Sequence, residues 1–146
     1  MSYSLDANIL IHASNRASER HVKAAAFLEA RVDDPDVLCL TWPVAMAYQR
    51  IVTHPSIFEE PLTPAEAWAN ITSLLNLPRT RVITEDASFA ELFKDLNQAQ
   101  TIRGNLVPDA HLAALLQEHG VKRLYTADAD FRRFPYLEVI NPFEPL

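Results

Sequence analysis

The sequence contains a single cysteine, two glycines and no long apolar run among its 146 residues. Cys39 alone can form neither an intramolecular disulfide nor a cysteine-based zinc site, which suits a reducing compartment. Gly104 and Gly120 cannot make a glycine-rich dinucleotide or phosphate loop. Because no apolar stretch approaches the length of a bilayer span and the N-terminus lacks a signal-peptide pattern, we expect a cytoplasmic protein with no membrane segment.

Positive charge is also scarce, with 13 Lys and Arg against 19 Asp and Glu and a net charge of −6. This balance argues against a basic domain that binds nucleic acid along a groove. It does not exclude an enzyme that acts on nucleic acid, because divalent metals reverse the local field at a carboxylate-lined site. If the acids are concentrated in such a site, four arginines stay free to meet phosphates: Arg50, Arg103, Arg132 and Arg133.

Length and composition fit one globular domain, which we expect to span residues 1–146. Short apolar runs alternate with longer stretches of helical period, which is typical of an α/β fold with a mostly parallel sheet and helices on both faces. We expect strands at residues 1–5, 37–41, 81–84, 124–126 and 137–140. We expect helices over residues 7–14, 21–32, 44–52, 64–77, 89–96 and 109–119.

Capping residues support several of these helices. Thr63-Pro64-Ala65-Glu66 is a capping box with proline at the first helical position. Ser18 and Asp86 are the expected caps of the helices that follow them, and Gly120 closes the helix before it. In the second helix we expect a buried face formed by Val22, Ala25, Ala26 and Leu28.

Aspartates follow the expected strands at the points where those strands end. In LYTADADFRRF, residues 124–134, Asp128 and Asp130 come just after an apolar run, and Asp6 directly follows the first strand. Asp109 opens a helix after a loop, where its carboxylate can point back to the same edge. Because open parallel sheets bind ligands beyond the carboxyl ends of their strands, we expect these four carboxylates to lie together.

Several anions at one place repel each other, and a hard divalent cation relieves that repulsion. Mg²⁺ or Mn²⁺ prefers carboxylate and water oxygens, and Asp109 also gains from the positive end of its helix dipole. Such a metal can polarise a phosphoryl oxygen, generate hydroxide from bound water and stabilise a leaving oxygen. The sequence therefore predicts a metal-dependent hydrolytic site.

Each acid also has a purely structural explanation. Asp6 can cap the helix after the first strand, Asp109 can be an ordinary first-turn acid, and Asp128 can cap the segment before Phe131. Only their joint occurrence at strand ends favours the functional interpretation.

Other chemistries find little support. There is no G-x-S-x-G elbow, and the five histidines include no metalloprotease pair. A phosphoacceptor domain would need a lysine late in the chain, and Lys122 is poorly placed for it. We expect Trp42 and Trp68 to be core residues rather than a platform for stacking bases.

Four segments, in order along the chain, resemble PIN-domain ribonucleases, specifically toxins of the VapC type. They are LDANILIHASN with HVKAAAFLEA, then WPVAMAYQRIVTHPSIF with PLTPAEAW, then GNLVPDAHLAALLQEHG, and finally LYTADADFRRFPYLEVINP. The resemblance implies a PIN-like α/β fold and a metal-dependent endoribonuclease that is held inactive by a VapB-like antitoxin.

The resemblance also implies roles for individual residues. It makes Asp6, Asp109 and Asp128 the ligands of one Mg²⁺ or Mn²⁺, and Asp130 a supporting acid or a ligand of a second metal. Asn8 and Thr126 would orient a ligand or a water by hydrogen bonds.

Arg50 is left with two interpretations: it neutralises charge on the phosphate, or it is a solvated surface residue. Ala45 stands about where many such nucleases carry a glutamate, a few residues before the arginine. That departure leaves fewer carboxylates for a second ion, so we expect one metal held by the protein and any second one recruited by the RNA.

The implied partners are RNA, a VapB-like antitoxin and a second copy of the chain in a homodimer. The antitoxin would occupy an apolar groove, for which the first and third helices are candidates. Two other functions stay open: a catalytically silent PIN fold that binds antitoxin or RNA, and an RNA-processing nuclease outside toxin–antitoxin systems. The sequence does not identify the RNA target.

Overall fold

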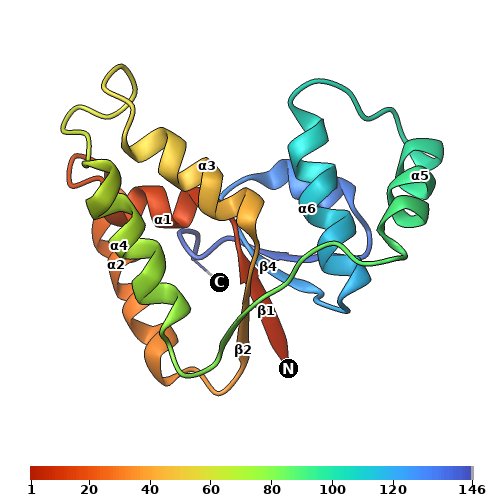
Figure 1. Ribbon diagram of the computed structural model, residues 1–146, viewed down its shortest axis with the longest axis horizontal. Helices are drawn as coiled ribbons and strands as arrows, with labels where there is room; N and C mark the ends of the chain where they lie inside the picture. The colour runs from red at the N-terminus through yellow and green to blue at the C-terminus, as the bar shows by residue number, and fades with distance from the viewer. Residues whose placement is uncertain (146) are drawn as a thin grey trace.

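The computed structural model describes residues 1–145, which form a five-stranded sheet flanked by helices (Figure 1). All strands are parallel, in the order β3-β2-β1-β4-β5. The strands are β1 (Ser2–Leu5), β2 (Val37–Leu40), β3 (Thr80–Val82), β4 (Arg123–Tyr125) and β5 (Glu138–Ile140). The predicted α/β class with a parallel sheet is confirmed.

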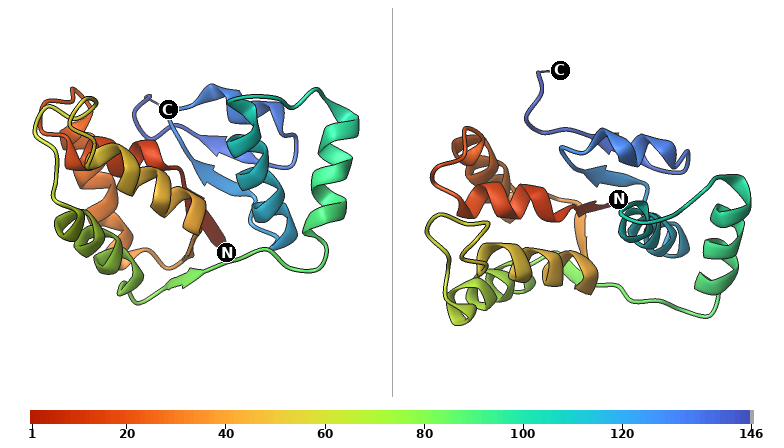
Figure 2. Two further views of the ribbon diagram at one scale, coloured as in Figure 1. Left: turned by 45° about the horizontal axis from the view of Figure 1, so that its top comes forward. Right: turned by 90° about the horizontal axis from the view of Figure 1, so that it is seen from above.

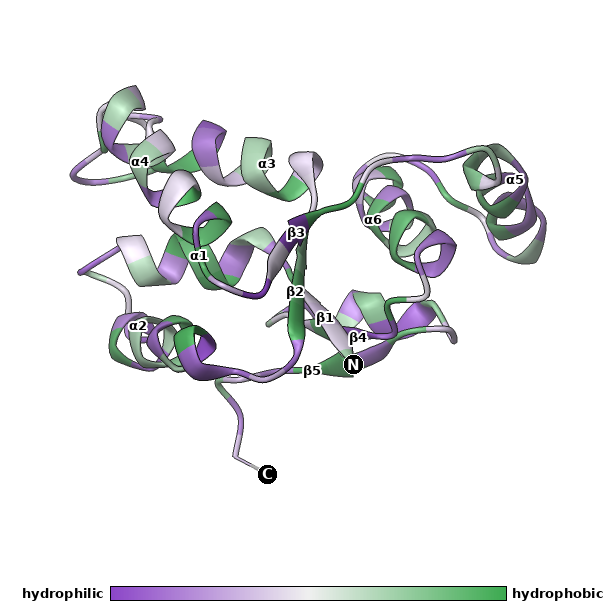
Figure 3. Cartoon of the chain, turned by 60° about the horizontal axis from the view of Figure 1, so that its bottom comes forward, coloured by the Kyte–Doolittle hydropathy of each residue, from purple (hydrophilic) through white to green (hydrophobic). Residues whose placement is uncertain are grey.

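Helices cover both faces of this sheet, as expected of parallel strands joined by crossovers. They are α1 (Ala7–Ser14), α2 (His21–Ala30), α3 (Trp42–Val52), α4 (Pro64–Leu75), α5 (Phe89–Ala99) and α6 (Leu106–Glu118), with 3₁₀ helices η1 (Arg31–Asp33) and η2 (Ala129–Arg133). Figure 3 shows α1, α2 and α4 on one side of the sheet and α5 and α6 on the other. Figure 2 shows α5 at the outer end of the molecule, beyond α6.

The central strands are buried because both of their faces are covered. Leu5, Leu40 and Leu124 have no exposed surface, and each belongs to a different neighbouring strand. The polar Ser4 is also fully buried, and its hydroxyl donates a hydrogen bond of 2.7 Å to the Cys39 carbonyl on the next strand. This bond fixes the alignment of β1 with β2 close to the edge where both strands end.

Side-chain caps mark the start of α3, which leaves this edge, and the start of α4, which follows it. Thr41 Oγ1 accepts from the Val44 amide at 3.4 Å at the start of α3, and Thr63 Oγ1 accepts from the Glu66 amide at 3.1 Å at the start of α4. The prediction that α4 begins after Thr63 is confirmed. Gly120, with a φ of +70°, lies just past the end of α6, in the left-handed conformation that glycine adopts most easily.

The predicted caps of α2 and α5 were wrong. Ser18 lies before the N-cap of α2, which is Arg20, and the Ser18 hydroxyl instead contacts His12 Nδ1 at 2.7 Å. The N-cap of α5 is Ser88, with no side-chain cap, and Asp86 Oδ1 accepts from the neighbouring Ala87 amide. Both side chains satisfy local turns before the helix begins, which competes with capping.

The predicted buried face of α2 was also wrong. Val22 is 77% exposed and Ala25 and Ala26 are exposed, whereas Ala24 is fully buried and Leu28 half-buried. Ala24 and Leu28 are four residues apart and share one side of the helix, and that side packs against α1. The apolar pattern therefore predicted a buried side about half a turn around the helix from the side that packs against α1.

Helix α6 begins at Leu106, three residues before the predicted start at Asp109, and Asp109 lies in its first turn, as expected. Within residues 1–145 no helix has the length and apolar character needed to cross a membrane.

Candidate active site at the carboxyl edge of the sheet

Asp6 lies where β1 ends and α1 begins. Its Oδ1 accepts a hydrogen bond of 2.7 Å from the Ala7 amide, so the carboxylate is the N-cap of α1. Its backbone amide donates to the Tyr125 carbonyl at 3.0 Å, which joins the end of β1 to the end of β4. The structural role foreseen for Asp6 is thus present, and Oδ2 is left for other partners.

Oδ2 of Asp6 is held by a small hydrogen-bond network. Thr126 Oγ1 donates to it at 2.8 Å and Asn8 Nδ2 donates to it at 3.1 Å. Asn8 Nδ2 also reaches Thr126 Oγ1 at 3.1 Å, and Asn8 Oδ1 accepts from the Ala127 amide at 3.3 Å. Asn8 and Thr126 therefore orient the carboxylate itself, whereas the sequence suggested that they orient a ligand.

The same threonine connects Asp6 to the acids after β4. The Asp128 amide donates to Thr126 Oγ1 at 3.0 Å, and Asp128 Oδ1 accepts from the Asp130 amide at 2.9 Å. Asp128 is thereby the N-cap of η2, the structural alternative considered for it. Asp128 is half-buried and Asp130 exposed, so the first belongs to the floor of the site and the second to its rim.

Asp109 comes to this edge from the opposite direction. Helix α6 leads into β4, and its first turn lies where the strands end (Figure 1). Burial raises the pKa of Asp109 to about 6, with further increases from the charges of Asp128, Asp6 and Asp130. Burial likewise raises the pKa of Asp6, partly offset by the hydrogen bonds from Thr126 and Ala7. Four acids from three distant segments thus share one electrostatic site.

The chemistry of this donor set fits a hard divalent cation, because all available ligands are carboxylate oxygens. Among residues 1–145 no three Asp, Glu, His or Cys side chains converge closely enough to enclose an ion. Mg²⁺ commonly takes one or two protein carboxylates and keeps several waters, so it does not require such a cage. The expected ligands Asp6, Asp109 and Asp128 would hold the ion either directly or through these waters.

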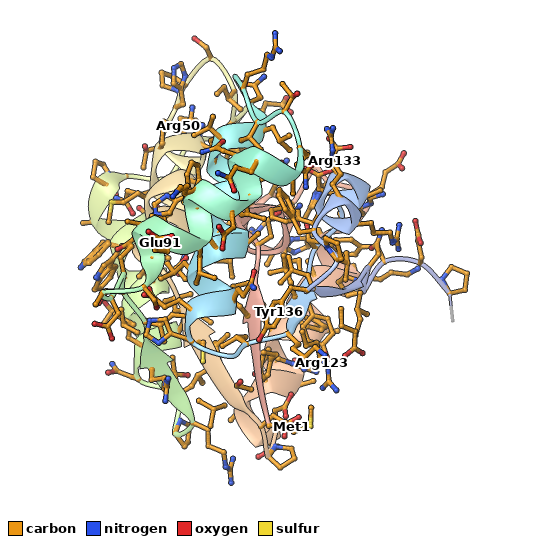
Figure 4. All side chains as sticks on the ribbon, turned by 90° about the vertical axis from the view of Figure 1, so that its right-hand side faces the viewer. Met1, Arg50, Glu91, Arg123, Arg133 and Tyr136 are labelled. Carbon is orange, nitrogen blue, oxygen red and sulfur yellow. The ribbon has the colours of Figure 1, made fainter. Side chains whose placement is uncertain are left out.

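The structure places the remaining candidates outside the hydrogen-bonded network. Arg50 is exposed in the last turn of α3, and Figure 4 shows it and Arg133 toward the end of the molecule opposite Met1, the end to which the strands run. Ala45 lies on the buried face of α3 and is fully enclosed in the core. An alanine without exposed surface leaves little space for a longer acidic side chain at this position.

Sequence reasoning missed the position of the tryptophans. Trp42 and Trp68 are each 38% exposed rather than buried, and their rings stack with centroids 6.3 Å apart. The helical pattern contains a signal for this, because the buried face of α3 runs through Val44, Ala45 and Tyr48, and Trp42 precedes it at the first helical position.

An apolar groove lies away from the acids, between α1, α2 and α4. It has a volume of about 560 Å³ and is lined by Leu10, Leu28, Ile71 and Leu74, with Arg16 and Glu29 among its charged residues. At this groove the Tyr48 hydroxyl contacts Ser14 Oγ at 2.7 Å and accepts from Asn70 Nδ2 at 2.9 Å. Helix α1, one of the two helices expected at the groove, is one of its walls, whereas α3 contributes Tyr48 to the lining.

Comparison with known proteins gives consistent matches over nearly the whole chain. The family model of the PIN domain matches residues 3–136. Ribonuclease VapC48 of Mycobacterium tuberculosis is 39% identical over 143 residues, which cover 98% of this chain and 99% of the relative.

Solved structures match the fold at lower identity. VapBC2 from Rickettsia felis, crystallised with a DNA fragment from its promoter, has a TM-score of 0.67 and 21% identity over 97% of this chain and 98% of the other. Mycobacterium tuberculosis VapC20, a toxin that cleaves the sarcin–ricin loop, has a TM-score of 0.63 and 18% identity over 90% and 93% of the two chains.

Proposed function

The chain belongs to the PIN-domain family and to its VapC ribonucleases, and from this premise we propose that it is a metal-dependent endoribonuclease, the toxin of a toxin–antitoxin pair. The observation that carries the proposal is the meeting of four aspartates at one sheet edge, where burial and the charges of the other three raise the pKa of Asp109. A 39% identical ribonuclease that aligns over 98% of this chain supports the reaction class. We take residues 1–146 as a single PIN domain that acts in the cytoplasm, where RNA and a VapB-like partner are present.

In the proposed mechanism Asp6, Asp109 and Asp128 bind one Mg²⁺ or Mn²⁺. The bound cation would activate water for attack on the phosphate and offset the charge that develops there. Thr126 and Asn8 keep Asp6 Oδ2 oriented through their hydrogen bonds, so that the ligand is held before the metal arrives. Asp130 at the rim supports the site, and the exposed Arg50 is available to an RNA phosphate.

The test is cleavage of purified total RNA by protein freed of any copurifying antitoxin, with Mg²⁺ or Mn²⁺ against EDTA. Asp109→Asn is compared with Asp33→Asn, which changes an exposed acid in η1. We expect discrete fragments with metal, loss of cutting by at least about 100-fold in Asp109→Asn, and no change in Asp33→Asn. Absence of metal-dependent cutting in the parent protein would favour the silent PIN fold, for which the buried Ala45 is the specific argument.

We also propose that the groove between α1, α2 and α4 binds an apolar segment of the antitoxin. Its lining is mostly aliphatic, and its charged residues include both signs, so an amphipathic helix or extended tail suits it. The solved VapBC complex from Rickettsia felis supports a VapB-like partner for a protein of this fold.

Two neighbouring alanines of α2 give a matched test of this groove. Ala25 lines it and Ala26 does not, and both are exposed. Ala25→Arg is expected to weaken antitoxin binding about 10-fold or more, whereas Ala26→Arg leaves it unchanged and both variants keep RNA cleavage. Equal binding by the two variants would reject the groove as the docking site. Sedimentation of the free toxin tests the expected homodimer.

A further inference from the structure

The tryptophan pair is the exposed aromatic feature that the proposed mechanism does not use. Trp42 begins α3 and Trp68 lies in the second turn of α4. Their rings are inclined by only 21°, and each side chain is 38% exposed. Met46, one turn after Trp42 on α3, is 48% exposed. Large apolar side chains gathered on a surface in this way indicate a binding site more often than isolated ones do.

Strand register indicates that Trp42 lies at the same sheet edge as Asp6. Ser2 of β1 pairs with Val37 of β2 and Tyr3 pairs with Leu38, and the bond from Ser4 to Cys39 continues that alignment. Asp6 and Thr41 are the residues that directly follow β1 and β2, so they leave the same edge of the sheet from neighbouring strands. Trp42 is the next residue along the chain, so the tryptophan pair begins at the edge where the proposed metal ligands lie.

The charge of this surface differs from that of the whole chain. Helix α3 contains no acid, and its one charged side chain is the exposed Arg50. Helix α4 carries a single charged side chain, Glu66. In a chain with a net charge of −6, these helices therefore repel a polyanion little and offer it one cation.

We propose that Trp42 and Trp68 form a platform on which unpaired nucleobases of the RNA stack while the neighbouring phosphate enters the acid site. This inference rests on the proposed nuclease function and adds the chemistry of substrate recognition to it. Indole rings stack on any base, because every base presents a π-face, and unpaired bases in loops are the ones free to do so. The platform thus selects for unpaired bases beside the cleaved bond, with little preference among the four.

Intrinsic fluorescence tests the proposal directly, since Trp42 and Trp68 are the only two tryptophans in the sequence. The Asp109→Asn protein with Mg²⁺ is titrated with 12-nucleotide oligomers of riboadenosine and of ribouridine, and binding is followed in parallel by the polarisation of a labelled oligomer. We expect tryptophan emission to fall by more than half at saturation with either RNA. Saturable binding with unchanged emission, or no binding of either oligomer, would overturn the platform.

Cleavage kinetics provide the second readout. Trp42→Ala and Trp68→Ala are expected to raise the KM for RNA roughly 10-fold with kcat changed less than about twofold. Trp42→Phe and Trp68→Phe keep a ring and should recover most of the affinity. Val22→Ala, which shortens an exposed side chain on α2, should leave KM unchanged. Thermal unfolding of each variant shows whether the fold is kept, and the fluorescence titration decides the question if an alanine variant does not fold.

The results of these experiments distinguish a failure of the platform from a failure of the proposed nuclease function. Metal-dependent cleavage with a normal KM in both alanine variants would support the nuclease function and reject the platform. Quenching of the tryptophan emission by RNA, without any cleavage by the parent protein, would support the platform and reject the nuclease function. If emission depends on protein concentration alone, and the alanine variants shift the chain from dimer to monomer without changing RNA binding, the surface joins two copies of the chain and the platform is rejected.

Discussion

Thr126 donates a hydrogen bond of 2.8 Å to Asp6, although 120 residues separate them in the sequence. The threonine is 1% exposed, and its oxygen also accepts from the Asp128 amide and from Asn8. One hydroxyl thus connects two proposed metal ligands that leave neighbouring strands. The orientation of Asp6 depends on a side chain that itself never needs to touch the metal.

Replacing this hydroxyl should disturb both stability and metal binding. Thr126→Val keeps the shape but removes one of the two hydrogen bonds to Asp6 Oδ2 and leaves the Asp128 amide without its partner, at a cost of about 1–3 kcal/mol in the free energy of unfolding. We expect the half-saturating Mn²⁺ concentration for cleavage to rise about 10-fold, because partners that orient metal ligands contribute on that scale. Thr126→Ser, which retains the hydroxyl, should stay close to the parent protein; a serine variant as impaired as the valine variant would argue against the network.

Asp109 should destabilise the metal-free fold at neutral pH. Its pKa of about 6 lies above the usual value of about 3.9, so the native state binds a proton before the unfolded chain does as the pH falls. The penalty is complete above pH 6 and disappears toward pH 4. In EDTA at pH 7.5, Asp109→Asn is expected to raise the free energy of unfolding by about 1 kcal/mol, less than the full shift because the group is only half-buried. Urea unfolding should show this gain at pH 7.5 and not at pH 4; an equal effect at both would refute the electrostatic origin.

Metal affinity should depend on pH for the same reason. Binding requires ionised carboxylates, and both Asp109 and Asp6 have pKa values above the ordinary one. Between pH 7.5 and 5.5 we expect the half-saturating Mn²⁺ concentration to increase by about 10-fold or more, as measured by cleavage at fixed RNA concentration. Asp130→Asn, which changes the exposed rim acid, should keep most of this dependence. A flat profile would mean that neither acid binds the ion.

Restoring a glutamate at Ala45 is expected to harm the fold. Ala45 has no exposed surface and belongs to the core that includes Tyr48 and Val52. A carboxylate there is both too large and poorly solvated, so Ala45→Glu should lower the free energy of unfolding in EDTA by roughly 2–4 kcal/mol. Chemical denaturation with Ala47→Glu as control, at the half-buried position two residues later, measures the difference. An Ala45→Glu protein as stable as its control would mean that this position opens onto the acid site after all.

The sequence predicted the sheet and the positions of the acids well, because both follow from short-range patterns. Apolar runs flanked by helices indicate parallel strands, and an aspartate just after such a run lies at the ligand-binding edge wherever the helices pack. Asp6 and Asp128 therefore came to the same edge without any knowledge of the tertiary contacts.

What the sequence did not predict depends on those contacts. The buried side of α2 was assigned wrongly because Val22 and Ala24 are both apolar, and only the packing against α1 decides between them. Trp42 and Trp68 were expected in the core because large aromatic side chains usually are. Their stacking brings together residues from two helices, and no spacing within either helix reveals it. The bonds from Asn8 and Thr126 to Asp6 likewise form only once β1 and β4 are side by side.

The most direct test of the account is Mn²⁺ binding to the antitoxin-free protein, measured by calorimetry at pH 7.5 without RNA. We predict one ion per chain, with affinity reduced at least 10-fold by each of Asp6→Asn, Asp109→Asn and Asp128→Asn, and unchanged by Asp33→Asn. Binding of one ion per chain that is lost when any of the three aspartates is replaced would establish that the carboxyl edge of the sheet is a metal site. Binding that survives in the three variants, or RNA cleavage at Mn²⁺ concentrations where no ion binds, would contradict it.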